Sequence, residues 1–215
     1  RTPMGGGRSY GPTHSQSIEK IFNGLNNIQI IALNTFIEPK ILLDEINKYS
    51  HTTILIENKL DYGRLQNILP NSIDYKFSIS DARYPIIKSA PNAVDSNFCI
   101  ITYGGSIHTV FKSIDEIFYE YEIFPIVICL TKIYPLQIEQ LIEITKNMKY
   151  VLTVEEGNIE GGFGSEIIAN LSENSNNKTY KRVGSYNAPI PSTKDLEKEV
   201  LINTKLILNA IGEML

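Results

Sequence analysis

The order of apolar and polar residues in the first part of the chain predicts helices and strands in turn. Residues 17–25 have helical spacing, and the nearly all-apolar run 28–33 is typical of a buried parallel strand. Pro39 begins a second predicted helix, and the β-branched run 53–57 predicts the next strand. Strand, helix and strand in this order make a βαβ unit. The pattern then weakens towards a turn at Pro70-Asn71.

A small, polar stretch at residues 89–96 interrupts this alternation, and we interpret it as a linker. After it the alternation restarts, with Ser106 expected to cap a long helix. The strands predicted after the linker are 98–102, 126–130, 150–154 and 180–183, and the helices are 107–121, 135–146, 165–171 and one or two near the end. We therefore predict an α/β fold with a mostly parallel sheet. Its parts are an incomplete first domain at 1–88, the linker, and a complete second domain at 97–215.

The end of the chain carries an apolar stripe that includes Leu196, Val200 and Ile207. Apolar residues near the terminus extend well beyond one helical stripe. A helix that is apolar on more than one side is usually covered by another element. We therefore expect a second copy of the chain to cover it, because two-fold dimers are the commonest assemblies.

Composition narrows the class of protein. The chain has 215 residues, a net charge of −4 and no basic stretch, which argues against a nucleic-acid partner. No apolar run reaches the roughly 18 residues of a membrane span, and the first residues lack the apolar region of a signal peptide. Cys99 and Cys129 lie in apolar strands, match no metal motif, and are expected to be buried and reduced. We expect a cytoplasmic protein without a metal site in this chain.

The most specific stretch is Arg1 to Ser17, RTPMGGGRSYGPTHSQS, which runs from a glycine cluster to a His-Ser-Gln triplet. It resembles a loop of the β-subunits of 2-oxoacid dehydrogenase complexes, and Gly-Pro-Thr-His is similar to the same loop in transketolases and 1-deoxyxylulose 5-phosphate synthases. The segment 56–63, IENKLDYG, favours the dehydrogenase subunits. Later segments resemble landmarks of the transketolase C-terminal domain and the end of the β-subunit, in the same order: 101–104, 130–136, 154–165, and 182–184 with Pro189 and Pro191.

The resemblance implies the C-terminal part of the β-subunit of a thiamine-diphosphate enzyme. Residues 1–88 would belong to the pyrimidine-binding domain and residues 97–215 to the transketolase C-terminal domain. The implied reaction is oxidative decarboxylation of a 2-oxo acid with acyl transfer to a lipoyl group. Implied partners are an α-subunit that carries the diphosphate site, a second copy of the chain, and a lipoyl acyltransferase core. Thiamine diphosphate and Mg²⁺ are expected in the full assembly and neither on this chain alone.

His14 is the one candidate catalytic residue. It follows a glycine-rich loop and precedes a predicted helix, a position from which a side chain can face a cleft. Its imidazole could hydrogen-bond a substrate carboxylate or a developing oxyanion, or transfer a proton. The residues that would bind the cofactor are unknown from the sequence.

The chain departs from the family pattern in ways that keep other functions open. The family's pyrimidine-contacting glutamate has no counterpart here, and the segment 47–51, where related subunits often carry a cation-binding carboxylate, reads NKYSH. The alternatives are a transketolase or deoxyxylulose-phosphate-synthase type of transferase and a non-catalytic assembly module. Arg1, Arg8 and His14 are few groups for a phosphosugar site, which favours the dehydrogenase.

Two further motifs have structural explanations. Gly161-Gly-Phe-Gly164 lacks the residues of a phosphate-binding loop, so we attribute it to close helix–sheet packing. Glu155 and Glu156 are adjacent in a predicted strand and should point to opposite faces, which argues against a shared acid–base site. His108, in the long helix, is expected at the surface or at an interface.

Overall fold

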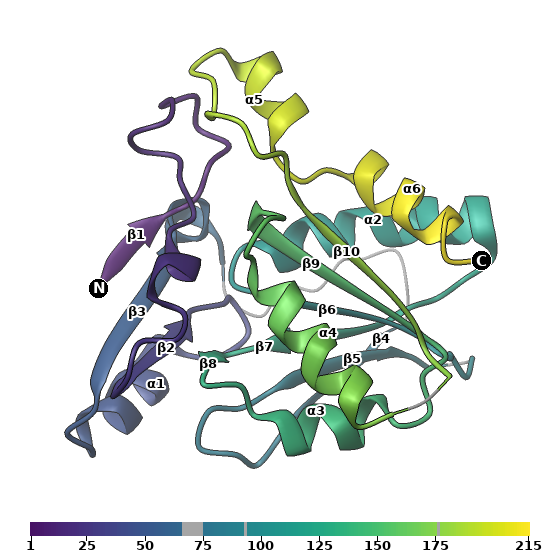
Figure 1. Ribbon diagram of the computed structural model, residues 1–215, viewed down its shortest axis with the longest axis horizontal. Helices are drawn as coiled ribbons and strands as arrows, with labels where there is room; N and C mark the ends of the chain where they lie inside the picture. The colour runs from purple at the N-terminus through teal and green to yellow at the C-terminus, as the bar shows by residue number, and fades with distance from the viewer. Residues whose placement is uncertain (66–74, 93, 176) are drawn as a thin grey trace.

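The structure, a computed structural model, describes residues 1–65, 75–92, 94–175 and 177–215 and contains two β-sheets (Figure 1). The turn predicted at Pro70-Asn71 lies outside the described residues. The described residues form an α/β fold with mostly parallel sheets, so the predicted fold class is confirmed.

The first sheet has the strand order β1-β3-β2-β8. Its strands are β1 (Thr2–Met4), β2 (Ile28–Ala32), β3 (Thr52–Asn58) and β8 (Lys132–Tyr134). β1, β3 and β2 are parallel, and α1 (Pro39–Asn47) makes the crossover between β2 and β3, as the βαβ pattern predicted. The pattern did not predict β1, which directly precedes the glycine cluster, or β8, which pairs antiparallel with β2.

The second sheet has the strand order β10-β9-β6-β7-β5-β4. Its strands are β4 (Tyr75–Ile79), β5 (Ile87–Pro91), β6 (Phe98–Tyr103), β7 (Ile126–Leu130), β9 (Tyr150–Asn158) and β10 (Thr179–Ser185). The four strands from β10 to β7 are parallel, and the antiparallel hairpin β4–β5 extends the sheet beyond β7.

The sheets divide the chain differently from the predicted domains. The hairpin β4–β5 was assigned to the first domain, but β5 pairs with β7 of the second sheet, with Ile87 opposite Cys129. The predicted linker, residues 89–96, begins inside β5. In the other direction, β8 of the predicted second domain pairs with β2 of the first sheet. These short strands show no clear periodicity in the sequence. Their place in the sheets depends on the strand with which each one pairs.

Helices cover both faces of the second sheet (Figure 1). On one face α2 (Ser106–Tyr121) packs against α6 (Thr204–Gly212), and on the other α3 (Ile138–Thr145) packs against α4 (Phe163–Glu173). The helix predicted to begin with a Ser106 cap has Gly105 at its N-cap position, without a side-chain cap. The helix predicted at 17–25 is a short 3-10 turn, η1 (Glu19–Phe22), since Gly24 has a φ of 82° and leaves the helical path.

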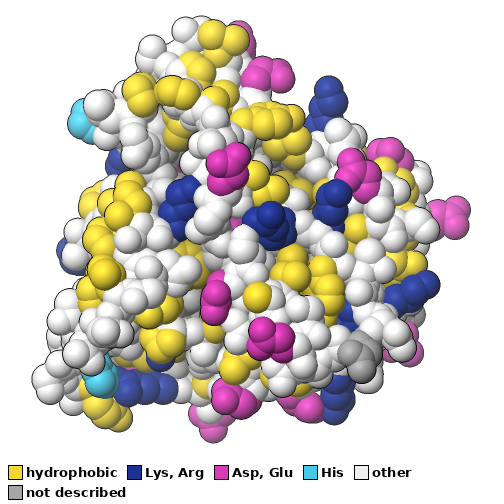
Figure 2. All heavy atoms as spheres, in the orientation of Figure 1, with side chains coloured by type: hydrophobic (Ala, Val, Ile, Leu, Met, Phe, Trp, Pro, Cys, Tyr) yellow, Lys and Arg dark blue, Asp and Glu magenta, His cyan; other side chains and the backbone are white. Residues whose placement is uncertain are grey.

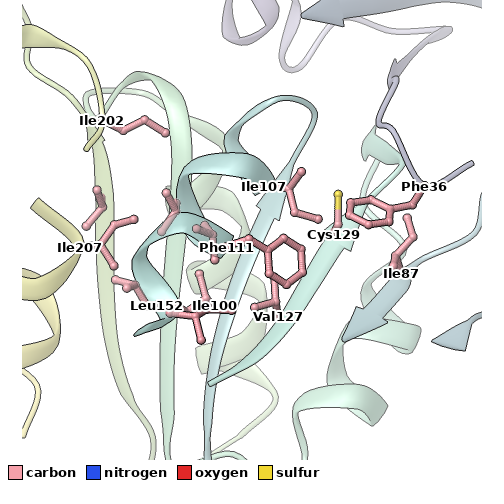
Figure 3. Close-up of a cluster of buried hydrophobic side chains, with 14 of the residues drawn as sticks. Phe36, Ile87, Ile100, Ile107, Phe111, Val127, Cys129, Leu152, Ile202 and Ile207 are labelled. Atoms are coloured by element: carbon pink, nitrogen blue, oxygen red, sulfur yellow. The ribbon is translucent and has the colours of Figure 1, made fainter. Parts of the chain in front are cut away.

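Buried side chains join the two sheets into continuous cores. Figure 3 shows Phe111 of α2 beside Val127 and Ile100 of the second sheet, with Phe36, which follows β2, beyond Cys129. Phe36 also stacks against Phe77 of β4 at a ring-centroid distance of 5.4 Å. The predicted domains therefore share a core.

The end of the chain is largely covered from within. Ile207, Ala210 and Ile211 of α6 are buried in the core shared with α2, and Leu206 and Leu208 pack against it. In the preceding helix α5 (Lys194–Val200), Leu196 of the predicted apolar stripe is 57% exposed, whereas its neighbour Glu197 is 1% exposed. The extra apolar surface therefore does not by itself require a second copy.

Candidate functional site

The glycine cluster opens a loop, residues 5–16, that projects from the end of β1 beside α5 (Figure 1). The backbone N–H of Gly5 donates to the carbonyl of Gln16 at 3.3 Å and closes the base of the loop. Gly5 has a φ of 96°, and a Cβ there would lie 2.8 Å from the Asn58 side chain and 2.9 Å from that of Glu156. Only glycine fits this position without displacing its neighbours.

Two carboxylates from the second half of the chain accept hydrogen bonds from this loop. Glu156, in β9, accepts the N–H of Gly6 at 2.6 Å and the Asn58 side-chain amide at 2.9 Å. Glu197, in α5, accepts the N–H of Gly7 at 3.0 Å and that of Ser9 at 2.8 Å. Hydrogen bonds to a charged acceptor are stronger than neutral ones, so these contacts fix the backbone of the loop.

His14 lies on the far part of the same loop with an exposed side chain. Its backbone is held on both sides, because its N–H donates to the carbonyl of Gly11 at 3.4 Å and Lys59 Nζ donates to its carbonyl oxygen. Within the described residues its imidazole makes no hydrogen bond or ion pair. The loop therefore combines a restrained backbone with a free imidazole, and the catalytic role of His14 stays a prediction.

Glu19, which follows the loop in the sequence, belongs to a buried group of three ionisable side chains. The Tyr103 hydroxyl lies 2.7 Å from Glu19 Oε1 and 3.2 Å from Glu155 Oε2, and it can donate its one proton to only one of them at a time. Burial raises the pKa of Glu19 to about 7 and raises the pKa of Tyr103 well above its ordinary value. Glu19 is therefore a neutral acid at pH values below about 7, beside a carboxylate that is held by other donors.

Glu155 caps the N-terminus of α4. Its two oxygens accept the backbone N–H groups of Phe163 and Gly164, each at 2.9 Å. A Cβ on Gly162 would lie 2.4 Å from the Glu155 carboxylate, which explains the glycine there. Close helix–sheet packing is thus confirmed at Gly162 and Gly164, whereas Gly161 has open space at its Cβ position. The chain's own carboxylate binds the amides that a phosphate would need. Glu155 and Glu156 have separate partners, as expected for adjacent strand residues.

A pocket of about 340 Å³ lies near the carboxyl ends of β2 and β3. On its wall Arg1 donates to Glu57 at 2.6 Å, and this hydrogen bond lowers the pKa of the Glu57 carboxyl. Arg64 pairs with Asp61 at 2.7 Å, and His108 Nε2 lies 3.1 Å from the same Asp61 oxygen. His108 is therefore a partly buried neighbour of Asp61 in η2 (Lys59–Gly63), where the sequence predicted a surface or interface position.

Neither cysteine has the environment of a reactive thiol. Both are free and buried on separate core clusters, and burial raises the pKa of Cys99 to about 12. Within the described part of the chain, no three His, Cys, Asp or Glu side chains are arranged to hold a metal ion. Among the same residues, no helix has the length and apolar character of a bilayer span.

The sequence pointed to the loop and to His14, but it did not identify the groups that hold the loop. Glu156 was considered only as one of a carboxylate pair, and Glu197 lies among other charged residues of α5 with no pattern that distinguishes it from Glu199. A charged residue that faces inward is identified by its partners, which here lie about 150 and 190 positions away in the sequence.

Mixed charges occupy the face shown in Figure 2, where lysine and arginine side chains alternate with acidic ones and hydrophobic side chains gather over the loop and α5. No basic patch of the kind that binds phosphate backbones is visible on this face.

Among known proteins, this chain is similar to β-subunits of 2-oxoacid dehydrogenases. The chain is 28% identical to a pyruvate dehydrogenase E1 component subunit beta of Gracilaria tenuistipitata var. liui, over 98% of this chain and 63% of the relative. It is 27% identical to a 2-oxoisovalerate dehydrogenase subunit beta of Bacillus subtilis, over 100% of this chain and 64% of the relative. The chain thus spans less than two thirds of the length of these relatives.

A solved structure described as a split-gene transketolase, inactive beta4 tetramer, shares the fold. Its TM-score is 0.69 at 14% sequence identity, over 98% of this chain and 64% of that one. Residues 92–207 match the family described as transketolase, C-terminal domain, which is more than half of the chain. The protein therefore belongs to the transketolase C-terminal domain family.

Proposed function

We propose that this chain is the C-terminal portion of the β-subunit of a thiamine-diphosphate-dependent 2-oxoacid dehydrogenase. The observation that carries the proposal is the extent of the similarity to named β-subunits, which covers 98–100% of the chain. It therefore includes the loop of residues 5–16 as well as the second sheet. The reaction would be oxidative decarboxylation of a 2-oxo acid, with the acyl group passed to a lipoyl carrier.

In this proposal the chain contributes the loop that carries His14. A restrained backbone limits the positions from which the exposed His14 imidazole can meet a substrate, which favours a role as a proton donor or an oxyanion partner. The exposure of His14 supports this role, since the side chain is open to a partner or substrate.

The described residues do not fit the diphosphate group or its metal ion. The amides at the N-terminus of α4 are bound to Glu155, and no group of three metal-ligating side chains is present among the described residues. The cofactor would therefore be held by an α-subunit, with a lipoyl acyltransferase core as the further partner. A second copy of the chain would complete the assembly.

The test is to purify the natural complex through this chain and to assay it with thiamine diphosphate, Mg²⁺ and an artificial electron acceptor. We expect reduction of the acceptor that depends on pyruvate or on 2-oxoisovalerate. Transfer of a ketol unit from a sugar phosphate without oxidation would instead assign the transferase class. Assembly with partners but no turnover of either substrate type would assign a non-catalytic module.

A further inference from the structure

Glu197 is a buried carboxylate enclosed by backbone amides of the glycine-rich loop. Its Oε1 accepts the N–H of Gly7 at 3.0 Å, and its Oε2 accepts the N–H of Ser9 at 2.8 Å. Gly7 and Ser9 have positive φ values of 82° and 59°, and both amides donate to the same carboxylate. Such a concave set of amides binds an anion, and here the anion comes from α5 of the same chain.

The negative charge of Glu197 has no ion-pair partner within the described residues. A buried carboxylate without a cation depends on its hydrogen-bond donors, and here the amides of Gly7 and Ser9 supply them together with the weaker 3.5 Å contact of the Ser9 hydroxyl. The dependence is mutual, because among the described residues these two amides have no backbone acceptor. Leu201 packs closely on the loop as well, since a Cβ on Gly6 would lie 2.6 Å from it.

The other contacts of the loop serve different purposes. Glu156 binds Gly6 at the base and also Asn58 of β3, so it joins the two sheets. Lys59 binds the carbonyl of His14 through an exposed contact. Glu197 is the buried side chain whose side-chain hydrogen bonds all go to the middle of the loop, between its base and His14.

We propose that Glu197 is a positioning residue, which holds the loop that carries His14 in one conformation. The proposal rests on the proposed function for the role of His14, but the hold on the loop does not. Through Glu197, α5 would contribute to the reaction although none of its residues would contact the substrate. Loss of the carboxylate charge would loosen the loop while the core of the second sheet stays intact.

The first measurement is amide hydrogen exchange of the full chain, resolved at Gly7 and Ser9. Glu197→Gln removes the charge, and its amide oxygen can accept from only one of the two donors while its N–H₂ group faces the other, so exchange at one or both amides should accelerate about tenfold or more. Glu199→Gln, an exposed change on the same helix, should leave both rates as in the wild type. Unchanged exchange in Glu197→Gln would overturn the proposal. If that variant does not fold, Gly7→Ala strains the loop at a φ of 82° and should accelerate exchange at Ser9; no acceleration there would overturn the proposal as well.

The second measurement separates positioning from substrate binding in the assembled complex. Glu197→Gln should lower kcat about tenfold and leave KM for the oxo acid within about twofold, because a displaced catalytic group costs rate rather than affinity. Equal kcat values in Glu197→Gln and Glu199→Gln would overturn the proposed role. If the wild-type complex does not oxidise a 2-oxo acid, the proposed function fails, and the exchange rates still decide whether Glu197 holds the loop.

Discussion

Glu156 and Gly6 lie 150 positions apart in the sequence, yet the Glu156 carboxylate accepts the Gly6 backbone N–H at 2.6 Å. Burial raises the pKa of Glu156, and the hydrogen bonds from Gly6, Asn58 and Ser17 oppose that rise. The contact joins the end of β9 to the loop that leaves β1. The position of the loop is therefore set by the second sheet as much as by the first.

Removal of the Glu155 carboxylate should destabilise the protein strongly. Glu155→Ala leaves the buried amides of Phe163 and Gly164 without an acceptor, which costs roughly 2–6 kcal/mol for two unsatisfied donors. Urea unfolding measures the loss. Glu166→Ala, an exposed change in the first turn of the same helix, should cost less than about 1 kcal/mol. Equal losses in the two variants would contradict the capping role.

The stability contribution of Glu19 should depend on pH with a defined sign. Its folded pKa is about 7 and its ordinary value is 4.5, so the folded state retains a proton that the unfolded chain has lost. The free energy of unfolding should therefore fall as pH rises from about 4.5 to about 7. Glu19→Gln stays neutral and should gain up to roughly 3 kcal/mol relative to the wild type across this window.

Urea unfolding of both proteins at pH 5 and pH 8 tests the Glu19 prediction. Tyr103→Phe is the matched variant, because loss of its hydrogen bond removes a contact that lowers the pKa of Glu19. The decline with pH in that variant should be at least as steep as in the wild type. If the free energy of unfolding differs between Glu19→Gln and the wild type by the same amount at both pH values, Glu19 does not retain its proton.

His14→Ala should lower kcat of the assembled complex by roughly 10²–10³-fold, the usual cost of one acid–base or oxyanion group. The protein should stay folded, since the side chain is exposed. His51→Ala removes another exposed imidazole outside the loop and serves as the control. If the activity of His14→Ala stays within a few-fold of the wild type, His14 has a structural role only.

The isolated chain should bind thiamine diphosphate weakly or not at all. The amides at the start of α4 are bound to Glu155, so few oriented donors remain to offset the freedom that the ligand loses. Calorimetric titration with the cofactor and Mg²⁺ measures the affinity. A one-to-one isotherm with a Kd of about 1 μM or tighter would refute this expectation.

A fragment that starts at Asn97 should be less stable than one that starts at Tyr75. The shorter fragment lacks β4 and β5, which removes Ile87 from the core and leaves β7 without its antiparallel neighbour. Loss of one buried isoleucine alone costs about 2–3 kcal/mol. Urea unfolding of the two fragments compares them, and equal midpoints would mean that the hairpin is dispensable.

The sequence alone determined the α/β class, the order of the longer elements and the loop with its candidate histidine. Periodicity carries this information where an element is long enough to show it, and residues 126–130 were predicted with the bounds that β7 has. The short strands β1 and β8 escaped detection, because three residues do not show a period. Their strand character comes from the partners β3 and β2.

Only the tertiary structure decided which charged side chains face inward. The apolar pattern placed Leu196 on the buried side of α5, but Leu196 is exposed and Glu197 is buried. The backbone amides of Gly7 and Ser9, near the N-terminus of the chain, need a hydrogen-bond acceptor beside α5, and Glu197 supplies it. A hydrophobic pattern records which side chains avoid water, whereas a buried carboxylate is set by distant donors that the pattern does not contain.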